Sequence, residues 1–291
     1  MNKTFRRLFF LVITTLLLFS LSGCDLLFDS FDKTTNNNIV NKVVEVEDFT
    51  IGDFQTAVCT AIEKAEKSVI SIVHTEGGWL GSTSLGSGVV VKRKAILKDQ
   101  NKGEVDGNIN GYEYYAITNR HVIVTDNYRI STSLKVYCGK GDEVVNATVE
   151  AYSNKEDLAL IYFTTPTYLP VASLADTTNI KKGTFAIAIG SPYSLEYYGS
   201  ATLGIVSYPI RYLEDEVFVL GRRPNSTVSN AYIQHDAAIN SGNSGGGLFD
   251  IEGKLIGINT QKLQSDYDVV IEGMGFSIPT HIIKEVFKDY L

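Results

Sequence analysis

The chain has 291 residues, a net charge of −7 at neutral pH and 44% apolar residues. This length is enough for one large or two modest domains, and the apolar content is that of a globular protein rather than a disordered chain. Nothing in the composition suggests the basic face that nucleic-acid binding needs, so we expect no nucleic-acid partner.

The N-terminus has the pattern of an exported protein. Three basic residues within the first seven positions precede a largely apolar run from Leu8 to Leu21. That run is short for a membrane span and is typical of a secretory signal peptide. It ends in Leu21-Ser22-Gly23-Cys24, which resembles a bacterial lipobox. We therefore predict a lipoprotein signal peptide over 1–23 and lipidation at Cys24, which would anchor the protein in the lipid bilayer on the extracytoplasmic face. An ordinary signal peptide or a signal anchor is the alternative.

A polar segment separates this leader from the first predicted helix. Residues 25–50 are mostly polar and contain the run Thr34-Thr35-Asn36-Asn37-Asn38, so we predict a tether over 24–50. From 53 to 67 apolar residues recur at helical spacing, and Asp53 suits a helix cap. This pattern predicts an N-terminal helix.

Many short apolar segments with turn signals between them follow the helix, which favours β-barrels or a sandwich. Pro166 and Pro170 divide them into two sets. Pro279-Thr280 opens a final helix that we expect to run to about Tyr290. The polar stretch 94–111 is expected to be a long exposed loop. The predicted strands are 68–74, 88–92, 114–118, 134–138, 143–152 and 158–163, then 185–189, 201–208, 231–235, 247–249, 254–260 and 275–278.

A glycine-rich run near the C-terminus contains the strongest candidate for a nucleophile. The run reads His235-Asp236-Ala237-Ala238-Ile239-Asn240-Ser241-Gly242-Asn243-Ser244-Gly245-Gly246-Gly247-Leu248. Glycines around Ser244 allow the backbone to approach a substrate closely. The N–H groups of Gly242 and Ser244, with that of Asn243 between them, could form an oxyanion hole. The alternative is a plain turn between two strands.

Two upstream segments can supply a base and an acid for Ser244. His121 follows an apolar strand in Thr118-Asn119-Arg120-His121-Val122, and Asp157 precedes one in Asp157-Leu158-Ala159-Leu160-Ile161. A serine hydroxyl needs an imidazole to take its proton and a carboxylate to orient that imidazole. Each residue alone also fits a structural role. Together their order along the chain, His, Asp, Ser, is that of chymotrypsin-type barrels, with the active site in the cleft between two barrels.

With these stretches the chain resembles the trypsin-like serine proteases of the HtrA (DegP-like) family over about 55–290. This resemblance implies an all-β, chymotrypsin-like fold of two six-stranded antiparallel β-barrels, at about 68–165 and 180–278, with an N-terminal and a C-terminal helix in a domain spanning 51–291. It also implies a serine endopeptidase of unfolded or misfolded proteins, without cofactor or metal, and a homotrimer is an option. Further matching stretches are Leu85-Gly86-Ser87-Gly88-Val89, Ala188-Ile189-Gly190-Ser191-Pro192, Thr202-Leu203-Gly204-Ile205-Val206-Ser207 and Gly273-Met274-Gly275-Phe276-Ser277-Ile278-Pro279.

Three features depart from the family pattern. Members commonly have Pro where Ser241 and Gly247 stand. We call residues 241–247, which carry Ser244, the nucleophile turn, and we expect Ser241 and Gly247 to loosen it without removing a catalytic atom. Many members also carry a PDZ domain after the second barrel, whereas this sequence stops at Leu291. We therefore expect a form that lacks a PDZ domain and its regulation.

Two positions near Ser244 narrow the expected chemistry. Digestive relatives have an Asp directly before the nucleophile, which pairs with a new N-terminus after zymogen cleavage. Asn243 cannot form that ion pair, so we expect no such activation. Relatives that cleave after basic residues have an Asp six positions before the serine. Ala238 stands there, so we expect an apolar substrate pocket and a small apolar P1 residue.

Other interpretations stay open at this point. Gly242 to Gly246 also fits the Gly-x-Ser-x-Gly pattern of α/β-hydrolases, with Asp268 and His281 as formal partners, but that fold needs a helix where we predict two strands. A weak or inactive protease scaffold acting as a chaperone, adhesin or binding module is the non-enzyme alternative. Cys59 and Cys138 could form a disulfide or remain two buried free thiols.

Overall fold

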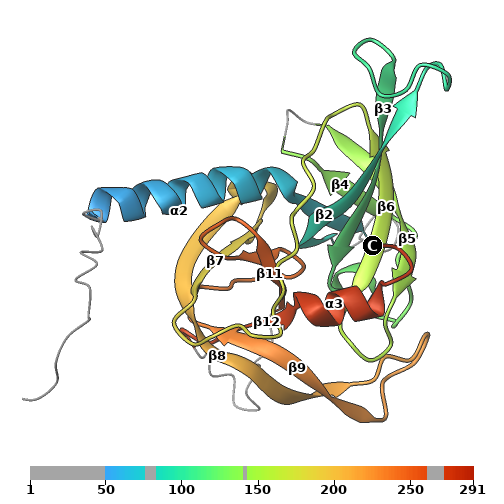
Figure 1. The fold of residues 1–291 in the computed structure, drawn as a ribbon. Helices are drawn as coiled ribbons and strands as arrows, with labels where there is room; N and C mark the ends of the chain where they lie inside the picture. Colours follow the sequence, from blue (N-terminus) through green and yellow to red (C-terminus); the bar gives the residue numbers. More distant parts are fainter. Residues whose placement is uncertain (1–49, 76–82, 140–142, 261–271) are drawn as a thin grey trace, which may run out of the picture. The chain divides into compact units, whose positions relative to one another are not determined.

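The computed structural model describes residues 50–75, 83–139, 143–260 and 272–291. Residues Thr50–Leu291 form one compact unit, which Figure 1 shows as a ribbon. The predicted signal peptide, Cys24 and all but the last residue of the predicted tether lie outside the described residues, as does Asp268. Predictions about these parts of the chain therefore stay predictions.

Six antiparallel strands close into a first barrel in the order β1-β2-β3-β6-β5-β4. Because β1 pairs with both β2 and β4, this sheet has no free edge. Apolar side chains such as Ile70, Ile72 and Ile161 fill its interior. The strands are β1 (Val69–Thr75), β2 (Thr83–Leu97), β3 (Ile109–Thr118), β4 (Leu134–Tyr137), β5 (Val144–Tyr152) and β6 (Ala159–Thr165).

A second barrel closes in the order β10-β11-β12-β9-β8-β7. Here β10 pairs with both β11 and β7. The strands are β7 (Phe185–Gly190), β8 (Ser200–Glu216), β9 (Thr227–His235), β10 (Gly247–Phe249), β11 (Leu255–Thr260) and β12 (Gly275–Pro279). The fold expected from the sequence, two six-stranded antiparallel barrels, is thereby confirmed.

Two α-helices flank the barrels in the described part of the chain. Helix α2 (Ile51–Ala65) begins at Thr50, which forms a capping box with Asp53. Asp53 is therefore the third residue of the helix rather than its cap, and a 3₁₀ turn, η1 (Glu66–Ser68), ends the segment. Helix α3 (Thr280–Val286) is shorter than expected. No helix in the described ranges is both long and apolar enough to cross a membrane.

The prediction of a loop over 94–111 is wrong at both ends. Strand β2 continues to Leu97 and β3 begins at Ile109, so only 98–108 connects them. The two strands form a ribbon that projects from the first barrel at the top right of Figure 1. The segment 98–108 is mostly polar and contains two glycines, so the pattern predicts a loop that also includes the short strand ends beside it, with apolar residues such as Ala95 and Leu97.

The two barrels share one hydrophobic cluster. Val89 and Leu160 of the first barrel belong to it together with Ile187 and Phe249 of the second. Ala61 of α2 and Ile283 of α3 join the same cluster, so both helices pack where the barrels meet. This common core places the ends of strands from both barrels at one junction.

Candidate active site

The structure brings His121 and Asp157 together. His121 lies in a 3₁₀ turn, η2 (Arg120–Ile123), directly after β3, and Asp157 lies just before β6. Because β3 and β6 are antiparallel neighbours, with Thr118 opposite Ala159, these two ends meet. The distance between His121 Nδ1 and Asp157 Oδ2 is 2.5 Å, and the backbone N–H of His121 donates to Asp157 Oδ1 at 2.9 Å.

The carboxylate is buried while the imidazole is open to solvent. The side chain of Asp157 is 4% exposed and that of His121 is 45% exposed. Two further groups approach the carboxylate: Thr260 Oγ1 donates to Oδ2 at 3.3 Å, and Arg120 Nη2 lies 3.8 Å from Oδ1. Hydrogen-bond donors and a nearby cation stabilise the charge of a carboxylate. The arrangement therefore suits an acid that orients a base.

Sequence reasoning assigned no role to Thr260 or Arg120. Thr260 is the last residue of β11 in the second barrel, and nothing in its local sequence links it to Asp157. Arg120 directly precedes His121 in the sequence. A cation next to the candidate base was therefore the one sequence feature that could have pointed to its role.

Ser244 lies at the same junction, in the turn that leads into β10. It is 5% exposed. Its carbonyl oxygen accepts from the N–H of Ser87 in β2 at 2.8 Å, so the turn is bonded to the first barrel. The next residue, Gly245, has φ +84°, and a Cβ there would lie 2.1 Å from the carbonyl oxygen of Ser87. Only glycine allows this close approach.

Ser87 is a second residue whose role the sequence did not reveal. Its carbonyl oxygen accepts from Thr118 Oγ1 at 2.7 Å, and Thr118 ends the strand before His121. Its hydroxyl donates to the carbonyl oxygen of Gly242 at 2.7 Å and accepts from the N–H of Ser191. Ser87 therefore connects the nucleophile turn to the strand that positions His121.

The nucleophile turn is held by several backbone hydrogen bonds. The N–H of Asn243 donates to Asn240 O at 3.0 Å, and that of Tyr193 donates to Ser241 O at 2.8 Å. Across the described residues no protein acceptor pairs with the N–H of Gly242 or of Ser244. These two donors are thus available to a ligand oxygen, whereas the Asn243 N–H is already bonded within the turn.

The remaining residues that the sequence pointed to have different surroundings. Ala238 is exposed, and its carbonyl oxygen accepts from Thr202 Oγ1 at 2.9 Å. His281 lies in α3, where its Nδ1 is 2.9 Å from Thr177 Oγ1.

Because strand β10 follows Ser244 in a barrel, the α/β-hydrolase alternative is wrong. Cys59 and Cys138 are both free, so of the two alternatives the disulfide is wrong and the free thiols are confirmed, although only Cys138 is buried and Cys59 is exposed.

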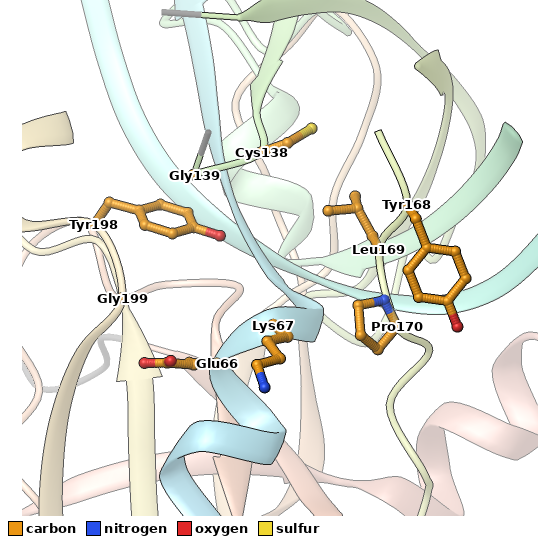
Figure 2. A pocket seen from close by; sticks show the side chains of 9 residues that line it. All are labelled: Glu66, Lys67, Cys138, Gly139, Tyr168, Leu169, Pro170, Tyr198 and Gly199. Carbon is orange, nitrogen blue, oxygen red and sulfur yellow. The ribbon is translucent and has the colours of Figure 1, made fainter. Parts of the chain in front are cut away.

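A cavity of about 430 Å³ lies apart from this constellation of residues (Figure 2). Burial raises the pKa of the Cys138 thiol in its wall to about 12, so at neutral pH this group is a poor nucleophile. The Tyr198 hydroxyl in the same wall donates to Val69 O at 2.5 Å. The cavity therefore offers no activated nucleophile. Nor do three His, Cys, Asp or Glu side chains gather into a metal site within the described ranges.

Comparison with known proteins gives a consistent set of relatives. A family model described as a trypsin-like peptidase domain matches residues 86–258. The serine protease Do-like HtrA of Lactococcus lactis subsp. cremoris is 33% identical over 269 residues, which cover 88% of this chain and 60% of that protein. The periplasmic serine endoprotease DegP of Escherichia coli (strain K12) is 35% identical over 204 residues, which cover 70% of this chain and 35% of DegP.

A solved structure, the HtrA-type protease AlgW with a tripeptide, matches with a TM-score of 0.57 and 27% identity over 80% of this chain and 62% of that one. The chain thus spans less than two thirds of the length of the two curated relatives and of this structure.

Proposed function

This chain belongs to the HtrA family of trypsin-like serine proteases, and from that premise we propose that it is a serine endopeptidase. Ser244 is the nucleophile, His121 the general base and Asp157 the residue that orients it. The observation that carries the proposal is the pair of hydrogen bonds from His121 to the buried carboxylate of Asp157. One bond orients the ring and the other holds the turn on which the ring sits.

The proposed reaction follows from these contacts. With its Nδ1 proton held by Asp157, His121 presents Nε2 to accept the proton of Ser244 Oγ as that oxygen attacks a peptide carbonyl. The developing oxyanion is received by the N–H groups of Gly242 and Ser244. Collapse of the intermediate gives an acyl-enzyme, and the amine leaves with the proton from His121. Water, activated by the same imidazole, then hydrolyses the ester.

The substrate and the location are part of the same proposal. We expect an apolar pocket near Ala238 that favours a small apolar P1 residue, and unfolded or misfolded proteins as substrates. The name of the relative DegP includes the word periplasmic, which supports an extracytoplasmic location here. Lipidation at Cys24 would then hold the protease domain at the membrane surface.

A fluorophosphonate probe tests the proposal, because it reacts with an activated serine whatever the natural substrate is. We expect labelling at Ser244 and casein cleavage by the wild type. Ser244→Ala should reduce turnover by about 10⁴- to 10⁶-fold. Ser133→Ala is the matched control. It alters an exposed serine that is distant from Ser244 in the sequence, and it should behave as wild type. An unlabelled wild type that binds unfolded clients without cleaving them would contradict the proposal and favour a binding scaffold.

A further inference from the structure

The loop that carries Asp157 is held by an arginine of its own barrel. We name residues 153–157, between β5 and β6, the acid loop. Arg120 Nη2 lies 3.8 Å from Asp157 Oδ1, and the Arg120 side chain is only 12% exposed. The other fork nitrogen, Nη1, donates at 3.1 to 3.3 Å to three backbone carbonyls of the acid loop, those of Ser153, Asn154 and Glu156. One guanidinium therefore fixes both the carboxylate and the loop behind it.

The second barrel reaches the acid loop through the long hairpin of β8 and β9, which runs along the bottom of Figure 1. The N–H of Phe218, in the connection between these strands, donates to Asn154 O at 2.8 Å. Asn230 Nδ2, on β9, donates to Lys155 O at 2.9 Å. Consecutive carbonyls of the acid loop are thus bonded to the second barrel.

Phe218 connects the two groups that hold the acid loop, namely the Arg120 guanidinium and the β8–β9 hairpin. The Arg120 Cζ atom lies 4.9 Å from the centre of the Phe218 ring, and the ring of Tyr152 meets Phe218 edge-on at 5.9 Å. Phe218 is only 5% exposed, so water screens this cation–π contact little. A guanidinium held between a ring and a carboxylate has one preferred orientation, which lysine cannot reproduce.

A buried polar cluster holds the hairpin in this position. Asp215 Oδ2 accepts from Asn230 Nδ2 at 2.7 Å and from the Tyr232 hydroxyl. Burial and the hydrogen bond to Asp215 both raise the pKa of Tyr232, so its hydroxyl stays protonated and remains a donor. The Asn230 amide has two protons, and it can give one to Asp215 and the other to the acid loop.

We propose that Phe218 and Arg120 are positioning residues through which the second barrel sets the orientation of Asp157 toward His121. Arg120 orients the carboxylate, and Phe218 keeps the Arg120 fork in place from the other barrel. The inference rests on the proposed protease function, because its consequence is a faster attack by Ser244. Phe218 and the Arg120 side chain are only 5% and 12% exposed, so we expect both to act on the rate of the chemical step rather than on substrate binding.

The test uses the full chain with two variants and a matched control. Phe218→Leu keeps an apolar side chain and removes the ring, and Arg120→Lys keeps the charge and removes the fork. Tyr208→Leu is the control. Tyr208 lies on the same hairpin with Arg211 Cζ 4.4 Å from its ring centre, so this variant also removes a ring–guanidinium contact. Folding of each variant is checked by its thermal unfolding midpoint.

Two measurements separate positioning from a merely structural role. In fluorophosphonate labelling we expect the saturating rate of both variants to fall about 10- to 100-fold, as for a small misplacement of catalytic groups, with an unchanged half-saturating probe concentration. In proton NMR we expect the low-field resonance of the His121–Asp157 hydrogen bond to weaken or disappear. Tyr208→Leu should keep the wild-type rate and the resonance.

The outcomes separate this inference from the proposed function. Wild-type rates and an intact resonance in Arg120→Lys, or in Phe218→Leu if it folds, would overturn the positioning role and leave the protease assignment untouched. A wild type that shows the resonance but never reacts with the probe would contradict the protease assignment. Loss of the resonance in the variants would then still support the positioning of Asp157 by Arg120 and Phe218.

Discussion

Asp157 is a buried carboxylate whose oxygens receive donors from both barrels. Leaving a buried carboxylate without donors costs several kcal/mol, so each donor contributes to the stability of this site. His121 and Arg120 belong to the first barrel, and Thr260 is a donor from the second, with its Oγ1 at 3.3 Å from Asp157 Oδ2. Thr260 is itself buried, which leaves little water to replace its hydroxyl.

Replacing Thr260 with Val tests this donor at nearly constant side-chain volume. We expect fluorophosphonate labelling of Ser244 to slow about 10-fold, because a hydrogen bond to a charged group contributes about 1.5 kcal/mol. Thr148→Val, at an exposed position on β5, is the control and should label at the wild-type rate. Equal rates for the two variants would mean that Thr260 does not support Asp157 during the reaction.

His235 is a fully buried histidine close to the nucleophile turn. Its Nε2 lies 3.0 Å from Ser277 Oγ, which donates in turn to Asn259 Oδ1 at 2.9 Å. Because that hydroxyl proton is used, His235 must donate from Nε2. Burial lowers the pKa of His235 to about 4, although nearby Asp236 acts in the opposite direction. The ring is therefore neutral at neutral pH.

This depressed pKa predicts a loss of stability in acid. An unfolded chain binds a proton at His235 near pH 6.5 and the folded one only near pH 4, so the contribution is complete above about 6.5 and is lost as the pH falls toward 4, by about 3 kcal/mol. His235→Gln keeps a donor near the Nε2 position and does not titrate. Urea unfolding should show a shallower loss of stability for this variant between about pH 7 and about pH 4.5. Parallel curves for the two proteins would contradict the assignment of this pH dependence to His235.

At the scale of the element, strand β10 shows what a side chain at position 247 would meet. Gly247 and Phe249 point to the same face of the strand, two residues apart. A Cβ on Gly247 would lie 2.2 Å from Phe249 Cε2, and the Phe249 ring is fully buried. Gly247 therefore has a packing role, since it makes room for a core aromatic ring, and its expected effect on the turn stays a prediction.

Gly247→Ala should lower the free energy of unfolding by about 1–3 kcal/mol, as overpacking in a core usually does. Because the clash is with the Phe249 ring, Gly247→Ala should lower the free energy of unfolding by less in a Phe249→Leu background. A double-mutant cycle from urea unfolding measures this coupling. Equal costs of Gly247→Ala in the two backgrounds would show that Phe249 is not the obstacle.

The elements also show what could be predicted from the sequence. Each of the twelve barrel strands was predicted near its observed place, because buried strands such as β6 and β11 are short apolar runs bounded by turn residues. The outer ends of β2, β3, β8 and β9 were missed, because polar and turn-forming residues in and beside these ends interrupt the apolar pattern. Turn glycines and strand ends also indicated His121, Asp157 and Ser244. The contacts of Arg120 and Phe218 could not be predicted, because they depend on how a hairpin of one barrel lies against the other.

At the scale of the whole molecule, the proposed catalytic site depends on contacts between barrels that fold from distant parts of the chain. The bond from Ser87 N to Ser244 O joins β2 to the nucleophile turn. The shared hydrophobic cluster joins the same barrels behind it. Both contacts form only when the two barrels have docked, so we expect labelling of Ser244 to report on the docked state rather than on either barrel alone.

The predicted anchor would determine where this molecule works, and it would depend on the thiol of Cys24. Several acyl chains on one cysteine would bind the bilayer stably, since each buried CH₂ contributes about 0.8 kcal/mol. Cys24→Ser should therefore move the protein from the membrane fraction to the soluble fraction and abolish incorporation of labelled palmitate. Cys59→Ser removes an exposed thiol on α2 and, as the matched control, should stay membrane-bound and labelled. A Cys24→Ser protein that remains in the membrane fraction, together with a wild type that takes up no palmitate, would instead indicate a signal anchor.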